Sequence, residues 1–452
     1  MSKPLMALAL WAAGAWHGAR ALDLQSAVDA AASRDPALLA GEHALNASRE
    51  SRTQAVAAML PTVNLVGAPS RLHGEVAFFG DAPVGRAYPS QSWAAKLSQP
   101  LLHAEHWVGV SRAGTAIAQT ELKHDMARRD TVVNTVQAYF DVLMAYDDML
   151  VAQDQCALSK EKLSVAEGGL RLGSVTLSER ADAQLALTRN MMQRDRAGAV
   201  LEDKRARLES MVQSPVERIA KLDLERDVNA LAPVESMAPE APAGVAPEVR
   251  IKQLGLALAR HDVRLQRAAN LPTVDLTVSK GRYTEGGNID LPLSASTSSR
   301  STVIGLQINV PIVNGGASMS RMRQSAELAL QADAELDVAT IEARRARQSS
   351  VSGLRRELQL LTQIRAALAL ADAVWRNERD ALRLGRKIDA DVMAAQFAVR
   401  ALHRDLNRSY YTAALHAIKL RSQDGAADLD LIATVTRWIG HNGGVYPCAF
   451  EG

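Results

Sequence analysis

LPTVNL at residues 60–65 and LPTVDL at residues 271–276 differ at one position and are offset by 211 residues. Each hexapeptide follows a stretch of helical periodicity, and its proline cannot continue a helix because it lacks an N–H. Beyond the proline, apolar residues recur with the period of two that is typical of a strand. The chain is therefore predicted to contain the same helix-to-strand junction twice.

Further stretches repeat at nearly the same offset. They are Pro36 with Pro247, Pro100 with Pro311, and LRLG at residues 170–173 with LRLG at residues 382–385. Self-similarity at a fixed offset indicates an internal duplication. We predict a first repeat at residues 22–212, a Pro- and Ala-rich linker at 213–247 with at most short elements, a second repeat at 248–422, and an unassigned C-terminal tail at 423–452.

Each repeat is predicted to contain a helix followed by a β-hairpin. The helices are expected at residues 24–60 and 248–271. Strand periodicity is weakest after Pro61, where Gly67 and Pro69 interrupt it. The alternating apolar residues are Val274, Leu276 and Val278, then Ile304, Leu306, Ile308 and Val310, and in the first repeat Trp93, Ala95 and Leu97. Runs of about 10 to 12 residues suit a tilted transmembrane strand, although an ordinary half-buried soluble hairpin has the same period.

Two very long helices are predicted beyond the β-hairpins. Residues 101–168 and 318–384 contain no proline and few glycines. Each helix would therefore span on the order of 100 Å at 1.5 Å per residue. Each ends at an LRLG turn, after which a second helix, at residues 177–212 or 388–421, runs back. The predicted fold is mainly α, with two long helical hairpins and two β-hairpins per chain.

The N-terminal residues predict export. Lys3 precedes an apolar run at residues 4–16, and Ala-Arg-Ala follows at 19–21, so residues 1–21 are expected to be a cleaved signal peptide. The run is shorter than the roughly 20 residues of a membrane-spanning helix. The residue directly after the expected cleavage site is Leu22 and not a cysteine, so a lipid anchor is not expected.

The composition argues against several classes of function. Acidic and basic residues nearly balance at a formal net charge of +2, without a basic patch interleaved with aromatics, so nucleic-acid binding is not expected. The two cysteines, Cys156 and Cys448, exclude a disulfide framework, and neither is assigned a role. Aromatic residues make up only 4% of the chain, which suits long packed helices better than compact globules.

Motifs for catalysis and cofactor binding are absent. The chain contains no Walker loop, no Gly-x-Ser-x-Gly elbow and no Gly-x-Gly-x-x-Gly, so it is not expected to be an enzyme or to bind a cofactor. His103 and His106 form the one close pair among ten histidines. The pair lacks the His-Glu-x-x-His order of a zinc protease and an evident third ligand, so no metal site is predicted.

The predicted strands require an oligomer if they lie in a membrane. In lipid every backbone N–H and C=O must be paired, so sheets cross membranes only as closed barrels. Four strands cannot close, and side chains fill the interior of a barrel of about eight strands. An open channel therefore favours at least three chains over two.

The chain resembles a known family, the TolC-like outer membrane factors. The resemblance rests on the two Leu-Pro-Thr-Val strand starts, on VPIVNGG at residues 310–316, and on the two Leu-Gly turns. It implies a homotrimer with a 12-stranded barrel in outer-membrane lipid, continuous with a periplasmic α-barrel. The protein would be the passive exit duct of a tripartite system, with a periplasmic membrane-fusion adaptor and an inner-membrane ABC exporter or proton-driven pump as partners. The strand-to-helix corners would carry Pro100, Pro311, Gly315 and Gly316.

The resemblance also implies a channel gate just after the Leu-Gly turns. Its residues would be Ser178, Glu179, Leu382, Lys387 and Asp391. Leu382 and Ala394 stand where the family has a tyrosine and a second acidic residue. Pairs of Glu179 with Lys387 across the hairpins would hold the tip closed, although helix ends also carry solvated charges of this kind. Exposed pairs contribute only about 0 to 1 kcal/mol each, so a docking partner could open such a gate.

Two other classes of protein share part of this pattern. A periplasmic helical scaffold or adaptor would have the same hairpins with a small water-facing sheet, and an enzyme would need a convergent set of catalytic residues. The lack of a lipid anchor favours a type I protein secretion duct over a multidrug efflux duct. The sequence names neither the cargo nor the inner-membrane partner.

Overall fold

The structure, a computed structural model, describes residues 21–76, 82–221, 246–286, 297–423 and 445–447. The expected signal peptide therefore lies almost entirely outside the described residues, as do Cys448 and most of the C-terminal tail. The chain divides into two compact units. One comprises Met1–Leu39, Asp125–Pro247 and Glu342–Gly452, and the other Ala40–His124 and Glu248–Ile341.

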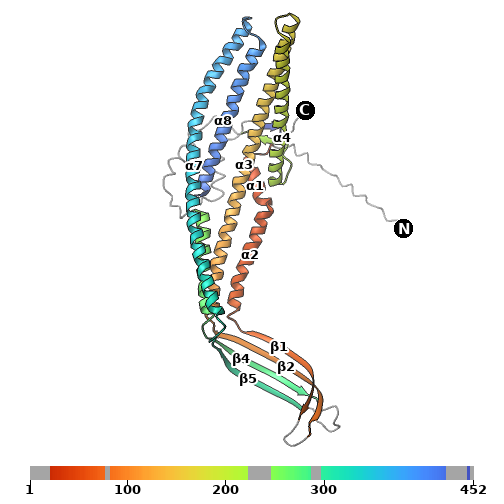
Figure 1. Ribbon diagram of the computed structural model, residues 1–452, viewed down its shortest axis with the longest axis vertical. Coiled ribbons are helices and arrows are strands. Elements are labelled where there is room, and N and C mark those ends of the chain that lie inside the picture. The colour runs from red at the N-terminus through yellow and green to blue at the C-terminus, as the bar shows by residue number, and fades with distance from the viewer. Residues whose placement is uncertain (1–20, 77–81, 222–245, 287–296, 424–444, 448–452) are drawn as a thin grey trace, which may run out of the picture. The chain divides into compact units, whose positions relative to one another are not determined.

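The second unit contains a four-stranded antiparallel sheet in the order β1-β2-β4-β5 (Figure 1). Each β-hairpin comes from one predicted repeat, and the two hairpins join where β2 pairs with β4. The outer edges of β1 and β5 pair with no other strand of the described chain. The strands are β1 Thr62–Val76, β2 Val84–Leu102, β4 Thr273–Glu285 and β5 Thr297–Asn309.

The register of the sheet separates an apolar face from a polar face. Leu276 lies opposite Leu306, and Asp275 lies opposite Gln307 on the other face. Further pairs on the apolar face are Val63 with Leu97, Leu65 with Ala95, Val278 with Ile304, and Val274 with Ile308. Leu306 is 63% exposed and Ile304 70% exposed, so this face is not covered within the described chain. The predicted alternation is confirmed.

The first hairpin differs in detail from the sequence prediction. β1 is continuous through Gly67 and Pro69 because both pair in register with β2. The Trp93 ring lies over Gly67, where a Cβ atom would be only 2.4 Å from the indole. β2 extends to Leu102, so the following helix begins at Ala104 and not at residue 101. Pro100 lies within β2 opposite Asp275, just before a register shift. The predicted corner at Pro100 is therefore wrong by a few residues, because pairing with β4 prolongs the strand.

The long helical hairpins are present in both repeats. α3 and α7 contain 68 and 67 residues, and α4 and α8 run back from them. The helices are α3 Ala104–Arg171, α4 Leu177–Val212, α7 Ala317–Arg383 and α8 Asp389–Gln423. None of the described helices combines the length and apolar character that a membrane-spanning helix requires.

The helix expected at residues 24–60 is two helices. α1 (Leu24–Arg34) ends at Asp35, and α2 (Pro36–Ala57) begins directly after it. Proline is well suited to the first position of a helix, where its missing N–H is not needed. Asp35 accepts hydrogen bonds from the backbone N–H of Ala37 at 2.8 Å and from the Thr131 hydroxyl at 2.9 Å. The helix expected at residues 248–271 is α6 (Pro247–Ala268).

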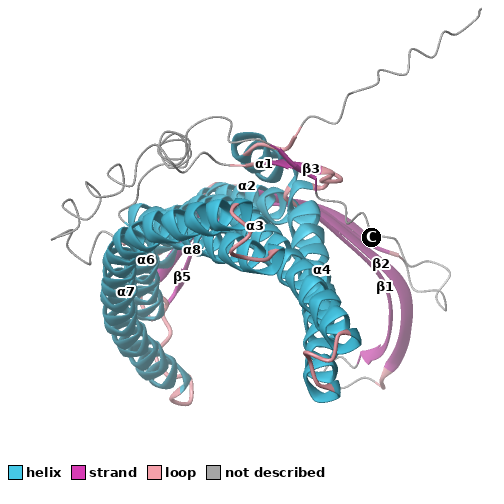
Figure 2. Cartoon of the chain, turned by 90° about the horizontal axis from the view of Figure 1, so that it is seen from above, coloured by secondary structure: helices cyan, strands magenta, loops and turns pink. Residues whose placement is uncertain are grey.

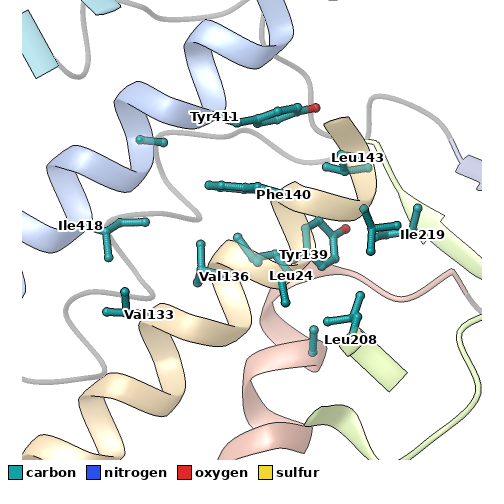
Figure 3. Close-up of a cluster of buried hydrophobic side chains, with 14 of the residues drawn as sticks. Leu24, Val133, Val136, Tyr139, Phe140, Leu143, Leu208, Ile219, Tyr411 and Ile418 are labelled. Carbon is teal, nitrogen blue, oxygen red and sulfur yellow. The ribbon is translucent and has the colours of Figure 1, made fainter. Parts of the chain in front are cut away.

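The main core lies in the first unit (Figure 3). Phe140 of α3 stacks on Tyr411 of α8, with ring centroids 5.0 Å apart, and both side chains are fully buried. Tyr139 donates hydrogen bonds to the carbonyl oxygens of Leu22 at 3.1 Å and Ala220 at 2.7 Å. The core therefore joins the start of the first repeat to the linker that follows it.

Short strands from the linker and the tail complete this unit. β3 (Arg218–Ala220) pairs with β6 (Val445–Pro447), and the N–H of Leu22, just before α1, bonds to the carbonyl of Arg218. β3 and α1 lie side by side in Figure 2. The Tyr446 ring lies 4.1 Å from the Tyr146 ring. The described part of the tail thus packs on the body of the protein, whereas the tail residues Trp438 and Phe450 lie outside the described residues.

Candidate functional site at the hairpin turns and the sheet corner

The two LRLG turns have the same backbone geometry. Gly173 and Gly385 have φ angles of +75° and +69°, a region that L side chains rarely adopt. The N–H of Ser174 bonds to the carbonyl of Gly169 at 2.9 Å, and the N–H of Arg386 bonds to the carbonyl of Ala381 at 3.0 Å. This is the glycine-terminated C-cap that satisfies the last carbonyl groups of a helix. The repeated sequence therefore specifies two equivalent helix ends.

Glu179 acts locally, at the start of α4. Its carboxylate accepts hydrogen bonds from the backbone N–H of Thr176 at 2.7 Å and from the Thr176 hydroxyl at 2.8 Å. The backbone N–H of Glu179 donates to the Thr176 hydroxyl in return, which completes a capping box. These hydrogen bonds lower the pKa of Glu179. Ser178, next to it, is exposed.

Lys387 also binds within its own hairpin. Its Nζ atom lies 3.3 Å from Oε2 of Glu378 and 3.9 Å from Oδ2 of Asp391. Asp391 in turn accepts the backbone N–H of Ile388 at 3.4 Å, near the start of α8. Sequence reasoning missed Glu378. Its position could have suggested the contact, because Glu378 lies about two helical turns before Gly385 and the chain folds back at that glycine, so that Lys387 comes close to this part of α7.

The expected pair of Glu179 with Lys387 does not form within the described chain. Each residue has the nearby partners given above, and the two hairpin turns are apart in Figure 1. Leu382 is half-buried, and its carbonyl accepts the N–H of Gly385 at 2.9 Å. Ala394 is half-buried on α8. The role of Glu179 and Lys387 in a gate stays a prediction.

Both turns also present apolar side chains to solvent. Leu172 is 85% exposed in the first turn, and Leu384 is 71% exposed in the second. Leu177 and Ile388, which begin the returning segments, are 71% and 50% exposed. Two leucines at equivalent positions of two repeats, each without a covering neighbour, are suited to contact with another protein.

The strand-to-helix corner of the second repeat is built from VPIVNGG. After β5 the chain turns at Gly315 and Gly316, whose φ angles are +63° and +81°. Asn314 then caps α7, since its side-chain oxygen accepts the N–H of Ser318 at 3.3 Å and its carbonyl accepts the N–H of Ala317 at 3.2 Å. The predicted corner at Pro311, Gly315 and Gly316 therefore lies between β5 and α7. Metal-ligating side chains converge elsewhere among the described residues, at His103, Glu105 and His106 between β2 and α3.

Comparison with known proteins identifies a family and relatives with similar sequences. The profile of a family described as outer membrane efflux protein matches residues 27–212 and 244–426. The chain is 25% identical over 453 residues to the alkaline protease secretion protein AprF of Pseudomonas aeruginosa, covering 94% of this chain and 91% of the relative. It is 23% identical over 435 residues to the proteases secretion protein PrtF of Dickeya chrysanthemi, covering 93% and 92%.

A solved structure has the same fold. The outer membrane channel CmeC of Campylobacter jejuni superposes with a TM-score of 0.73 at 16% sequence identity, covering 92% of this chain and 90% of that one. At this identity the likeness concerns the fold alone.

Proposed function

The chain belongs to the outer membrane efflux protein family, and on that premise we propose that it is one subunit of a trimeric duct for protein secretion. The predicted resemblance to TolC-like outer membrane factors is confirmed by the family match. The protein is an outer-membrane protein that extends into the periplasm, in a family of channels and not of enzymes.

The main support for a trimer is that the sheet has two unpaired edges, one at β1 and one at β5. β1 and β5 each pair on one side only within the described chain. Unpaired backbone groups are too costly in lipid, so β5 of one chain would pair with β1 of the next. Three chains of four strands make a 12-stranded barrel with an open interior.

The two faces of the sheet fit this closure. Leu276, Leu306 and their apolar neighbours would meet lipid, and Asp275 and Gln307 would face the lumen. A soluble scaffold would have to cover the exposed apolar face with another part of the protein, which the described chain does not do. The membrane duct is therefore the better account of the two.

The hairpin turns are the proposed contact for the periplasmic adaptor. A duct without a nucleotide-binding motif needs an inner-membrane ABC exporter or proton-driven pump, and an adaptor must reach both. Leu172 and Leu384 would enter apolar pockets of that adaptor. The ion pairs of Lys387 are exposed and weak, so docking could rearrange them at little cost.

Protein is the proposed cargo because two relatives that match over more than nine-tenths of this chain, PrtF and AprF, are named for the secretion of proteases. Multidrug efflux is the second candidate, since the family is described by efflux. Both functions use the same duct, and the inner-membrane partner would select the cargo.

A deletion in the native host separates the two functions. Loss of one or a few secreted proteins from the culture medium, restored by the wild-type gene, with unchanged drug susceptibility, would support protein secretion. Increased drug susceptibility with an unchanged set of secreted proteins would support efflux. Mass photometry of the purified protein in detergent tests the duct separately, and a monomer as the only species would contradict it.

A further inference from the structure

Two histidines and a glutamate converge at the junction of β2 and α3. His103 follows the strand, and Glu105 and His106 lie in the first turn of the helix. Oε1 of Glu105 is 3.8 Å from Nδ1 of His103 and 4.0 Å from Nε2 of His106. One ligand atom from each side chain lies within 4.8 Å of the others. The three residues thus surround one point, within a single compact unit of the chain.

A fourth residue orients the first histidine. Nε2 of His103 lies 3.1 Å from Oδ1 of Asp275 on β4. A carboxylate only accepts hydrogen bonds, so Nε2 of His103 donates to Asp275, and in the neutral imidazole Nδ1 then has the lone pair that a metal ion requires. Metal-bound histidines usually donate their other ring N–H to a carboxylate or carbonyl in this way, which sets the tautomer and the ring orientation.

The two imidazole rings lie close together, and a ring nitrogen of His103 has no hydrogen-bond partner in the part of the chain that the structure describes. The two rings stack with centroids 4.7 Å apart and an interplanar angle of 11°. Nδ1 of His103, one of the nitrogens that face Glu105, is buried without a hydrogen-bond partner among the described residues. Buried polar atoms normally have a hydrogen-bond partner, and a bound metal ion is an ordinary partner for a buried imidazole nitrogen.

We propose that His103, Glu105 and His106 bind a divalent transition-metal ion such as Zn²⁺. The ligands would be Nδ1 of His103, the carboxylate of Glu105 and Nε2 of His106, with water completing a tetrahedral site of two imidazoles and a carboxylate. Ligand atoms at about 2.1 Å from zinc are roughly 3.4 Å apart. The separations from Glu105, 3.8 and 4.0 Å, exceed this by about half an ångström, and all three side chains offer ligand atoms within 4.8 Å of one another, so side-chain rotations would have to draw the ligands together.

Sequence reasoning rejected this site for want of a third ligand. Glu105 stands between the two histidines in the sequence, but its carboxylate reaches both only because the chain passes from strand to helix at this point. Asp275 is 172 residues from His103 in the sequence, and pairing of β2 with β4 brings them together. His106 comes within reach of Glu105 in the same way, because both residues lie in the first turn of α3.

The site belongs to one repeat only. At the offset of 211 residues, the positions of His103, Glu105 and His106 correspond to Asn314, Gly316 and Ala317 in the second repeat. Asn314 caps α7 at the equivalent junction without metal-binding side chains nearby. The fold itself therefore does not require two histidines and a carboxylate here.

Direct metal binding tests the proposal. The full-length protein, purified in detergent with a tag that contains no histidine and stripped with chelator, is titrated with Zn²⁺ by calorimetry, and retained metal is measured by mass spectrometry after gel filtration. We expect about one tightly bound Zn²⁺ per chain. Absence of retained zinc in the wild-type protein would overturn the proposal.

Variants locate the site. The double substitution His103→Ala/His106→Ala should abolish binding, and Asp275→Asn should weaken it by roughly 10- to 100-fold through loss of ring orientation. His43→Ala, an exposed histidine in the same unit, should bind zinc as the wild type does. Helical content and oligomeric state are checked for each variant. Wild-type zinc binding in a correctly folded double variant would place the metal elsewhere and refute the inference.

Discussion

Arginine in place of Leu306 tests the membrane orientation of the sheet. Leu306 lies on β5 opposite Leu276, in the middle of the apolar run between Ile304 and Ile308. Gln307, the next residue, points to the opposite face and pairs with Asp275. Leu306→Arg and Gln307→Arg therefore add the same charge at nearly the same height on the two faces. Only the first charge would be placed in lipid.

The expected cost follows from the depth of each position. An arginine on the lipid face costs about 2 to 4 kcal/mol at the bilayer midplane and about 0 to 1 kcal/mol near the interface. Thr302 lies on the same face as Leu306 and opposite Lys280, so this level of the sheet already carries a cation. Thr302→Arg should therefore cost much less than Leu306→Arg. Gln307→Arg gains Asp275 as a neighbour of opposite charge and should be tolerated.

The assay compares the three variants at equal expression. We measure the amount of trimer in the outer-membrane fraction, and then the free energy of unfolding of the protein folded into lipid bilayers. The expected order of stability is Gln307→Arg and Thr302→Arg close to the wild type, with Leu306→Arg lowest. If Leu306→Arg assembles and resists unfolding as well as Gln307→Arg does, the face assignment is wrong and another part of the assembly covers the apolar face.

Four further outcomes are expected. Lys387→Glu turns two attractions to carboxylates, each of about 1 kcal/mol near 4 Å in water, into repulsions. The trimer should then conduct several-fold more in planar bilayers, less so at high salt, and unchanged conductance would place the constriction elsewhere. Gly385→Ala should destabilise its turn by about 1 kcal/mol in amide exchange because φ is +69°, whereas Gly168→Ala, within α3, should not. Burial and the charge of a neighbouring lysine lower the pKa of His416, so the unfolded state binds the extra proton and stability should fall as pH drops below 6.5; His416→Gln should flatten this dependence in thermal unfolding. Tyr139→Phe removes a buried hydroxyl whose single proton lies within reach of two carbonyl oxygens; it should lower the free energy of unfolding in urea by about 1 to 3 kcal/mol, and a smaller effect would mean that water replaces the hydroxyl.

Local sequence patterns were sufficient for the element order. Three local patterns predicted the elements: the apolar alternation around Leu306, the absence of proline from residues 101–168, and LRLG before each turn. Each pattern involves residues that are close in the sequence, so it predicts a strand, a helix or a turn without knowledge of the rest of the fold. The same holds for Gly385, where the backbone conformation itself demands glycine. The duplication added a second, independent copy of each pattern, which is why the overall plan of helices and strands was predictable.

Boundaries were harder to predict where a distant strand supplies the hydrogen bonds. Pro100 was expected to end the first hairpin, but pairing of β2 with β4 continues to Leu102 through a register shift. Pro36 was placed inside one helix, but it begins α2, and Asp35 just before it accepts a hydrogen bond from Thr131 of α3. In each case a residue far away in the sequence offers contacts that the local pattern does not contain.

The local order of elements, the polar and apolar faces of the strands and the form of the turns follow from sequence, because each depends on residues within a few positions of one another. Which charged side chains meet was decided only by the tertiary structure. Lys387 lies against Glu378, and His103 lies against Asp275 on another strand. Side-chain pairing depends on distances of a few ångströms between segments whose packing no short stretch of sequence specifies, and for that reason the partners of these residues emerged only in three dimensions.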